Sequence, residues 1–119
     1  MSSFVTIERE VYLAQYSNHN MNIELKLNDN GRGAFVIEEN KEQVAEMAIG
    51  ISGPNLTVYH TEVSERLKGQ GIASQLLTEM VGYARKNKLK VIPLCSYVQA
   101  QFKRHENDYQ DVWNKDWHL

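Results

Sequence analysis

Two side chains with acid–base chemistry stand close together in a segment that is predicted to be a strand. His60 and Glu62 alternate with Tyr59 and Thr61 in the β-branched and aromatic segment 56–63, so they share one face of that strand. Either can act as a general base, because histidine titrates near neutral pH and glutamate does so when its pKa is raised. The alternatives are a structural histidine and a solvated carboxylate. No third ligand stands at a standard spacing from this pair, so no metal site is predicted.

Cys95, the only cysteine of the chain, is a third candidate. It follows the short apolar segment 91–94 and precedes Ser96, which forms a Ser-x-x-Gln capping box with Gln99 and begins a predicted helix. A thiol at a helix start faces the positive end of the helix dipole, which favours the thiolate and lowers the thiol pKa. Cys95 can therefore be a nucleophile, and the alternative is a small buried residue that closes the strand.

A glycine-bearing turn follows the segment 56–63 and contains Arg66, Leu67, Lys68, Gly69, Gln70, Gly71, Ile72 and Ala73. Glycines let the backbone turn tightly and let a ligand approach the main chain. The first amides of the next helix, together with its dipole, then form an anion site, typically for phosphate. The turn is not a Walker loop, because the chain has no GxxxxGK(S/T). It is not a good dinucleotide fingerprint either, because Ser74 stands where that motif needs glycine or alanine. A purely structural turn is the alternative.

The hydrophobic pattern predicts the elements that position these residues. From Ile72 onward, apolar residues recur every three or four positions along one broad helix face, which predicts a long helix. The segment 91–94 then lies parallel to the strand 56–63 through a right-handed crossover. Alternating and apolar segments predict four consecutive strands in an antiparallel meander, at residues 23–27, 34–38, 43–52 and 56–63.

Length and composition predict one domain, residues 1–119, with an N-terminal arm (1–20) and a C-terminal tail (106–119). The arm holds two possible short strands, 4–7 and 11–13. The tail contains Tyr109, Trp113 and Trp117, of which we expect at least the first two to pack, because two tryptophans are rare in a disordered tail.

Charge and hydropathy set limits on the class of function. A net charge of −2 argues against binding to nucleic acid by phosphate neutralisation. No segment approaches the ~20 apolar residues of a membrane span. With one cysteine and no export signal, the expected location is the cytoplasm. We expect a monomer.

The pattern Arg-x-x-Gly-x-Gly-x-Ala of residues 66–73 resembles motif A of the GNAT superfamily of N-acetyltransferases. The order of meander, glycine turn, helix, parallel strand and helix is also that of the GNAT fold, and it resembles in particular the small single-domain YjdJ-like branch. The expected fold class is α+β, a mixed, mostly antiparallel sheet with one parallel strand pair and two main helices. The segments that carry the resemblance are 60–63, 68–73, 95–97 and 108–112.

The resemblance implies an acetyl-CoA-dependent N-acetyltransferase that acts on a small-molecule or protein amine. Strand-like hydrogen bonds near Thr61 and Val63 would hold the pantetheine arm, and amides near Val63 would polarise the thioester carbonyl. The coenzyme A pyrophosphate would contact the turn, with residues Arg66, Lys68, Gly69, Gln70, Gly71, Ile72 and Ala73 as its predicted ligands.

The resemblance also implies a role in acetyl transfer for each of the three candidate catalytic residues. His60 or Glu62 would deprotonate the amine. Cys95 would either form an acetyl-cysteine or act as an acid toward the departing coenzyme A thiolate. A function of a different class is also open, namely a module that binds coenzyme A or acyl-CoA with little or no turnover.

Overall fold

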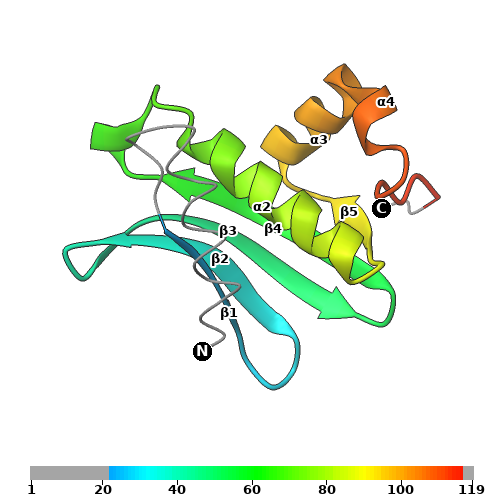
Figure 1. The fold of residues 1–119 in the computed structure, drawn as a ribbon, viewed down its shortest axis with the longest axis horizontal. Helices are drawn as coiled ribbons and strands as arrows, with labels where there is room; N and C mark the ends of the chain where they lie inside the picture. Colours follow the sequence, from blue (N-terminus) through cyan, green and yellow to red (C-terminus); the bar gives the residue numbers. More distant parts are fainter. Residues whose placement is uncertain (1–21, 117–119) are drawn as a thin grey trace.

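The computed structural model describes residues 22–116, which form one sheet with its helices on one side (Figure 1). The predicted strands 4–7 and 11–13, and Trp117, lie outside the described residues. The strands are β1 (Ile23–Leu27), β2 (Arg32–Glu39), β3 (Glu42–Ser52), β4 (Asn55–Val63) and β5 (Lys90–Pro93). The helices are the 3-10 turn η1 (Glu65–Leu67), α2 (Ile72–Lys86), α3 (Ser96–Arg104) and the short α4 (Glu106–Tyr109).

The five strands lie in the order β1-β2-β3-β4-β5. The first four pair antiparallel with their neighbours, and β5 pairs parallel with β4. This confirms the predicted α+β class, the meander and the parallel strand pair. None of the helices in the described part of the chain has the length and hydropathy to span a bilayer.

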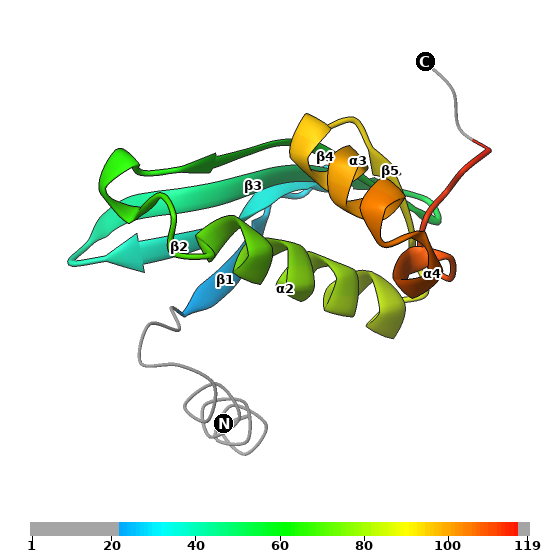
Figure 2. The ribbon, with the colours of Figure 1, turned by 90° about the horizontal axis from the view of Figure 1, so that it is seen from above.

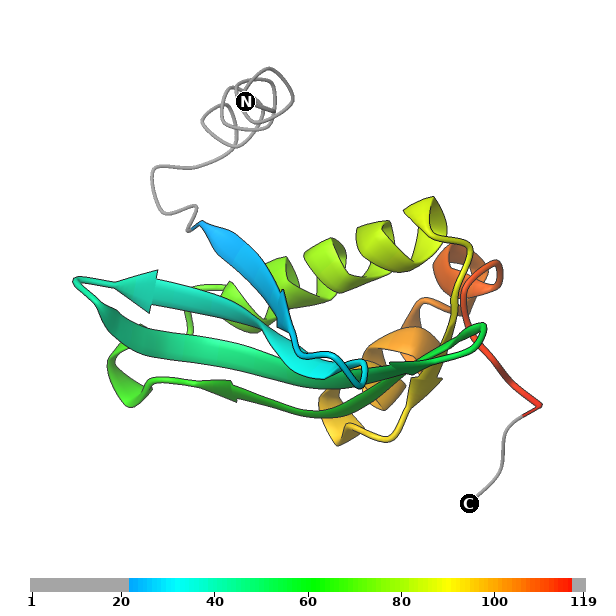
Figure 3. The same ribbon diagram turned by 90° about the horizontal axis from the view of Figure 1, so that it is seen from below.

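One face of the sheet carries the hydrophobic core. Leu25, Phe35, Met47 and Thr61 stand opposite one another across β1 to β4, and Phe35 and Met47 are buried. Figures 2 and 3 show α2 and α3 on this side of the sheet. The buried residues of α2 follow the predicted helical period, and they are Ile72, Leu76, Leu77, Met80, Val81 and Ala84.

The opposite face of the sheet carries rows of charged residues, and no helix of the described chain covers it (Figure 3). Residues that are paired from strand to strand form rows across this face, and neighbours in a row lie side by side. One row is formed by Glu24, Val36, Glu46 and Glu62, and the next by Lys26, Ala34, Ala48 and His60. His60 and Glu62 therefore share a face, as predicted.

Strand β4 separates from β5 at Val58. The ladder to β5 ends at the pair Val58 and Pro93, and the Val58 carbonyl accepts hydrogen bonds from the amides of Leu94 and Cys95 at 3.1 and 3.0 Å. On its other side β4 has a bulge, because Tyr59 is an extra residue between the pairs that face Ile49 and Ala48. Within residues 22–116, residues 59–63 consequently have no strand partner on the β5 side.

The start of α3 differs from the prediction. The N-cap is Cys95, which keeps an extended conformation, and Ser96 is already the first helical residue. The cause is the hydrogen bond from the Cys95 amide to β4, which holds residue 95 at the end of the strand. The predicted capping box is therefore wrong, and the Gln99 side chain donates to the Pro93 carbonyl at 3.3 Å instead.

The C-terminal segment packs against the rest of the fold. The ring of Phe102 stacks on Tyr109 at 4.6 Å between centroids and meets Trp113 edge-on at 5.6 Å, which confirms the predicted packing of both aromatics. The backbone also continues alongside β5: the Val91 amide donates to the Val112 carbonyl at 2.6 Å, and the Asn114 amide donates to the Val91 carbonyl at 2.9 Å. The segment is thus an integral part of the core and of the sheet.

Removal of the Phe102 ring tests this packing. The ring is fully buried, so Phe102→Ala should lower the free energy of unfolding by about 3–5 kcal/mol, as for other large buried aromatics. Urea unfolding followed by circular dichroism measures the loss. The exposed neighbour Lys103 provides the control, and Lys103→Ala should change stability by less than about 0.5 kcal/mol. Equal stability of the two variants would contradict the packing role.

Asp111 attaches the same segment to α2. Its carboxylate accepts hydrogen bonds from Arg85 Nε at 2.8 Å and Nη2 at 3.2 Å, and the guanidinium lowers the pKa of Asp111 below its ordinary value. A carboxylate with a lowered pKa stabilises the fold above its unfolded-state pKa, and this stabilisation is lost as the pH falls through the folded-state pKa.

The variant Asp111→Asn should therefore melt a few degrees below the wild type at pH 7, and the difference should shrink as the pH falls below about 4. The effect is small because the carboxylate is exposed. Asp116→Asn removes a carboxylate from the same segment that does not contact Arg85, and it should leave the melting temperature unchanged. Melting curves over a series of pH values would refute the ion pair if the two variants behaved alike.

Candidate active site

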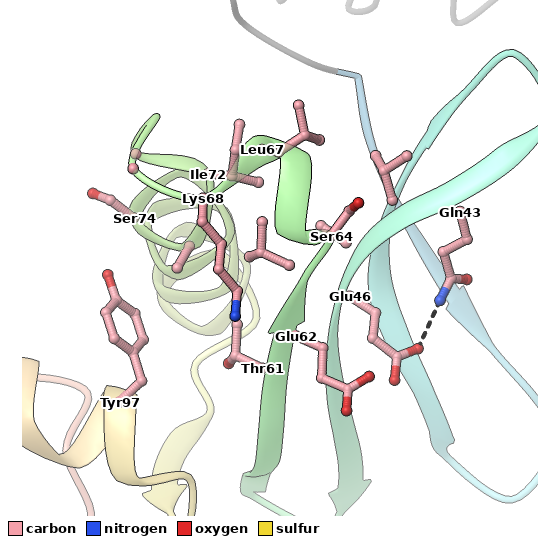
Figure 4. A pocket seen from close by; sticks show the side chains of 16 residues that line it. Gln43, Glu46, Thr61, Glu62, Ser64, Leu67, Lys68, Ile72, Ser74 and Tyr97 are labelled. Carbon is pink, nitrogen blue, oxygen red and sulfur yellow. Dashed lines mark hydrogen bonds between the residues drawn. The ribbon is translucent and has the colours of Figure 1, made fainter.

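A cavity of about 770 Å³ lies beside the free edge of β4 (Figure 4). Its walls come from the facing ends of β3 and β4, from the glycine turn, from the start of α2 and from Tyr97 of α3. The cavity therefore joins the predicted phosphate turn to the strand that carries the predicted acid–base residues. Its volume is in the range of small-molecule and cofactor sites.

The glycine turn has the geometry of an anion site. Gly69 and Gly71 have left-handed φ angles of 86° and 77°, and a Cβ added to either would meet no other protein atom within 4 Å. Helix α2 begins directly afterwards, and the Gly71 carbonyl accepts its first helical hydrogen bond, from Gln75 at 3.1 Å. The first turn of α2 contains no acidic residue and no side-chain cap. Its amides can therefore face a bound anion.

The residues predicted to bind coenzyme A do not all reach the cavity. Thr61, Val63, Lys68, Gly69, Gly71, Ile72 and Ala73 line it. Arg66 and Gln70 do not: Arg66 is paired with Glu39 at 2.7 Å, and the Gln70 side chain donates to the Arg66 carbonyl at 3.4 Å. In Figure 4 the Lys68 side chain extends from the turn toward Thr61. Lys68 is also paired, with Glu65 at 3.4 Å, but it lines the cavity and is therefore the cation of the turn that can meet a ligand there.

The free edge of β4 presents backbone groups to the cavity. The Ser64 amide donates to the Val44 carbonyl of β3 at 2.7 Å. Since successive amides of a strand point to opposite sides, the amides of Val63 and Thr61 point away from β3. An extended ligand beside β4 can therefore pair with them as a strand does.

Cys95 lies next to this edge, on the core side of β4. Its thiol is buried, with 5% of the residue exposed, and its Sγ lies 3.4 Å from the Oγ1 of Thr61, which lines the cavity. Tyr97, the second residue of α3, also lines the cavity and was not predicted as a site residue. Burial, with smaller contributions from Tyr109 and Cys95, raises the pKa of Tyr97 above 10.0, so its hydroxyl stays protonated at neutral pH.

His60 and Glu62 lie on the other face of β4, beside a residue that the sequence reasoning missed. Glu46 of β3 lines the cavity with Glu62, and its Oε2 lies 3.0 Å from His60 Nε2. Side-chain ligand atoms of the three residues lie within 4.8 Å of one another. Glu46 thus supplies a third metal-ligating group from the neighbouring strand, and the prediction that His60 and Glu62 lack one is wrong. The sequence does mark Glu46, because it is the only charged residue in the apolar segment 44–51.

The structure does not bring the three candidate catalytic residues together. His60 and Glu62 stand in rows of the outer face, opposite Ala48 and Glu46, whereas Cys95 contacts Thr61 in the core-facing row. The backbone of β4 therefore separates Cys95 from the predicted bases. The arrangement offers an acidic side, a side with the buried thiol of Cys95 and the half-buried phenol of Tyr97, and an anion site at the glycine turn.

The comparisons with known proteins agree with this geometry. Residues 34–112 match the family model of GCN5-related N-acetyl-transferases. The fold is similar to that of a GCN5-like protein from Staphylococcus aureus determined by NMR in solution, with 34% identity, a TM-score of 0.58, and coverage of 77% of this chain and 88% of that chain. An aminoglycoside acetyltransferase from an uncultured soil metagenomic sample, in complex with sisomicin, shares the fold at 14% identity and a TM-score of 0.53, with 99% of this chain and 84% of that chain covered.

No curated relative matches the chain. The narrower resemblance to the YjdJ-like branch stays a prediction. The family match spans most of the chain and includes the glycine turn, β4 and the start of α3, which are the elements that form the cavity. The chain therefore belongs to the family of GCN5-related N-acetyltransferases and is an acetyltransferase.

Proposed function

We propose that the protein transfers an acetyl group from acetyl-CoA to an amine, with coenzyme A along the free edge of β4. One observation carries this proposal: the open glycine turn at the start of α2 and residues 61–63 of β4, at the edge of that strand beyond its ladder to β5, border the same cavity. A phosphate group and an extended arm attached to it can therefore be held together in one site.

Each end of the ligand has matching groups on the protein. The pyrophosphate would contact the first amides of α2 and the turn around Gly69 and Gly71, with Lys68 adding a positive charge. The pantetheine arm would pair with the backbone of Thr61 and Val63. When bound, acetyl-CoA supplies an acetyl group activated as a thioester. The Val63 amide would stabilise the negative charge that develops on the carbonyl oxygen.

The residues around the cavity would also accept the proton of the amine and donate a proton to the leaving thiolate. Glu62 or His60 would take a proton from the amine, whose nitrogen forms the new bond to the acetyl carbon as the carbon–sulfur bond breaks. The thiolate leaves with the electron pair of that bond. Tyr97 would give it a proton, because its hydroxyl group is a proton donor at neutral pH and its side chain lines the same cavity. Cys95, beside Thr61, is the second candidate for this acid.

Addition of a methyl group at Gly71 tests the binding site. In Gly71→Ala the new Cβ meets no protein atom but would stand where a ligand approaches the turn, so we expect the dissociation constant for coenzyme A to rise about tenfold or more. Isothermal titration calorimetry measures it. Gly53→Ala is the matched control, because Gly53 has a φ of +57° and open space but lies in the β3–β4 turn.

Both glycine variants should lose about 1 kcal/mol of stability from left-handed strain, and they differ in ligand binding alone. If the two bind coenzyme A equally well, the site lies elsewhere. If coenzyme A binds but no free thiol is released from acetyl-CoA with any of a panel of amines, the protein is a binding module.

The role of Cys95 can be tested separately. We expect direct transfer to the amine, because Cys95 Sγ contacts the Thr61 hydroxyl, which is too weak a base to activate a thiol. Cys95→Ala should then retain transfer activity, and coenzyme A should protect the wild-type thiol from alkylation, since Thr61 lines the cavity. Mass spectrometry after mixing with acetyl-CoA alone gives the opposing outcome: an acetylated Cys95 that is consumed on addition of an amine would establish a covalent route.

A further inference from the structure

We propose that Glu39 and Arg66 are positioning residues: their ion pair holds the glycine turn in place for coenzyme A, and neither side chain contacts the ligand. Arg66 is the first residue of the Arg-x-x-Gly-x-Gly-x-Ala pattern, but its guanidinium binds the hairpin between β2 and β3. The inference rests on the proposed function, because the two residues act from outside on the site that this function requires.

Strand alternation places Glu39 on the face of the sheet that carries the helices. Phe35 and Ile37 precede it in β2 at intervals of two residues, and both are buried in the core. The neighbour Glu38 points to the other face, where it pairs with Lys26. Glu39 is the last residue of β2, and η1 lies at the same end of the sheet (Figures 1 and 2). Its carboxylate is thus within reach of η1.

The contact between the two residues is short and relieves a repulsion. Arg66 Nη2 donates to Glu39 Oε1 at 2.7 Å, a distance typical of a charge-assisted hydrogen bond. Glu42 stands directly opposite Glu39 in the hairpin, and two carboxylates in such a pair repel each other. The guanidinium offsets this repulsion. The ion pair therefore stabilises the hairpin end and joins it to a segment 27 residues further along the chain.

The backbone of η1 is already held next to the hairpin by two other contacts. The Ser64 amide donates to the Val44 carbonyl of β3 at 2.7 Å. Leu67 is buried in the hydrophobic core. Because both neighbours of the segment 65–66 are fixed, the Arg66 side chain reaches Glu39 with only its own rotamers to restrict.

The main chain of Arg66 connects this ion pair to the glycines. Its carbonyl accepts a hydrogen bond from Gln70 Nε2 at 3.4 Å. Gln70 lies between Gly69 and Gly71, the two residues of the turn with left-handed φ angles. Glycines have the greatest backbone freedom of all residues, so a ligand that binds them must restrict that freedom. A contact that restricts the turn beforehand lowers this cost and tightens binding.

The alternative role for Arg66 is a direct contact with the pyrophosphate. Neither Arg66 nor Glu39 lines the cavity, whereas Lys68 of the same turn does. A guanidinium that moved to a phosphate would also leave Glu39 facing Glu42 without its cation. The two roles predict opposite results when the carboxylate of Glu39 is removed. A free Arg66 would then bind the phosphate better, whereas a turn that has lost its support would bind coenzyme A less well.

The test is a double-mutant cycle. Isothermal titration calorimetry gives the dissociation constant of coenzyme A for the wild type, Glu39→Gln, Arg66→Gln and the double variant. We expect each single substitution to raise this constant about threefold to fivefold, the scale of a partly exposed ion pair. The double variant should bind no more weakly than either single variant, because both remove the same interaction. Removal of a negative charge would by itself favour an anionic ligand, so weaker binding by Glu39→Gln indicates positioning.

Glu38→Gln is the matched control. It removes the same charge from the adjacent position of β2, where the ion pair with Lys26 at 3.0 Å faces away from the turn. Its dissociation constant for coenzyme A should not rise. Transfer assays give a second readout, in which Glu39→Gln should raise KM for acetyl-CoA and leave kcat unchanged. Melting temperatures within a few degrees of the wild type would show that the variants stay folded.

The outcomes separate this inference from the proposed function. Coenzyme A that binds Glu39→Gln as tightly as the wild type, or more tightly, would overturn the positioning role and leave the proposed function standing. If Arg66→Gln alone weakens binding, its guanidinium is a phosphate ligand, and the inference is again wrong. Coenzyme A that does not bind the wild type would overturn both, since no ligand would then depend on the turn.

Discussion

The double hydrogen bond at the carbonyl of Val58 is the constraint on which the site depends. By accepting from both Leu94 and Cys95, this oxygen ends the ladder between β4 and β5 and directs the chain into α3. The bulge at Tyr59 adds local twist at the same point. The two strands then diverge, and residues 59–63 keep a row of unpaired backbone groups beside the start of α2. Without this separation a continuous ladder would occupy the place proposed for the ligand.

Strand alternation then divides the chemistry between two sides of β4. Thr61 faces the core and meets the thiol of Cys95, while His60 and Glu62 face outward and meet Glu46. A thioester lying along the strand edge would therefore have a proton donor on one side and proton acceptors on the other. Amine acylation can use this arrangement, because one proton leaves the nitrogen and another reaches the sulfur. Cys95 is too far from His60 and Glu62, across the β4 backbone, to form a catalytic dyad with either. This is consistent with separate groups for the two proton transfers.

Local pattern predicted most of the fold and part of the site. Three predictions came from residues close together in the sequence: the strands β1 to β4 from a period of two, the helix α2 from the helical period after Ile72, and the tight turn from its glycines. The structure contains all three. Glu46 and Tyr97 were missed because they enter the cavity through strand register and helix phase, which link residues far apart in the sequence. The N-cap of α3 was misplaced for a similar reason, since a hydrogen bond to β4 keeps Cys95 extended and overrides the local preference of Ser96.

The backbone that runs beside β5 has a consequence for the solubility of the protein. Sheet edges with free amides and carbonyls are templates for the addition of strands from other molecules. At β5 the residues from Val112 to Asn114 already use the donors and acceptors of Val91. The family model ends at residue 112, so part of this cover lies just beyond the shared domain. Residues 112–114 thus cover part of the β5 edge against pairing with a strand of another molecule, and the β4 edge at residues 59–63 stays open for the proposed ligand.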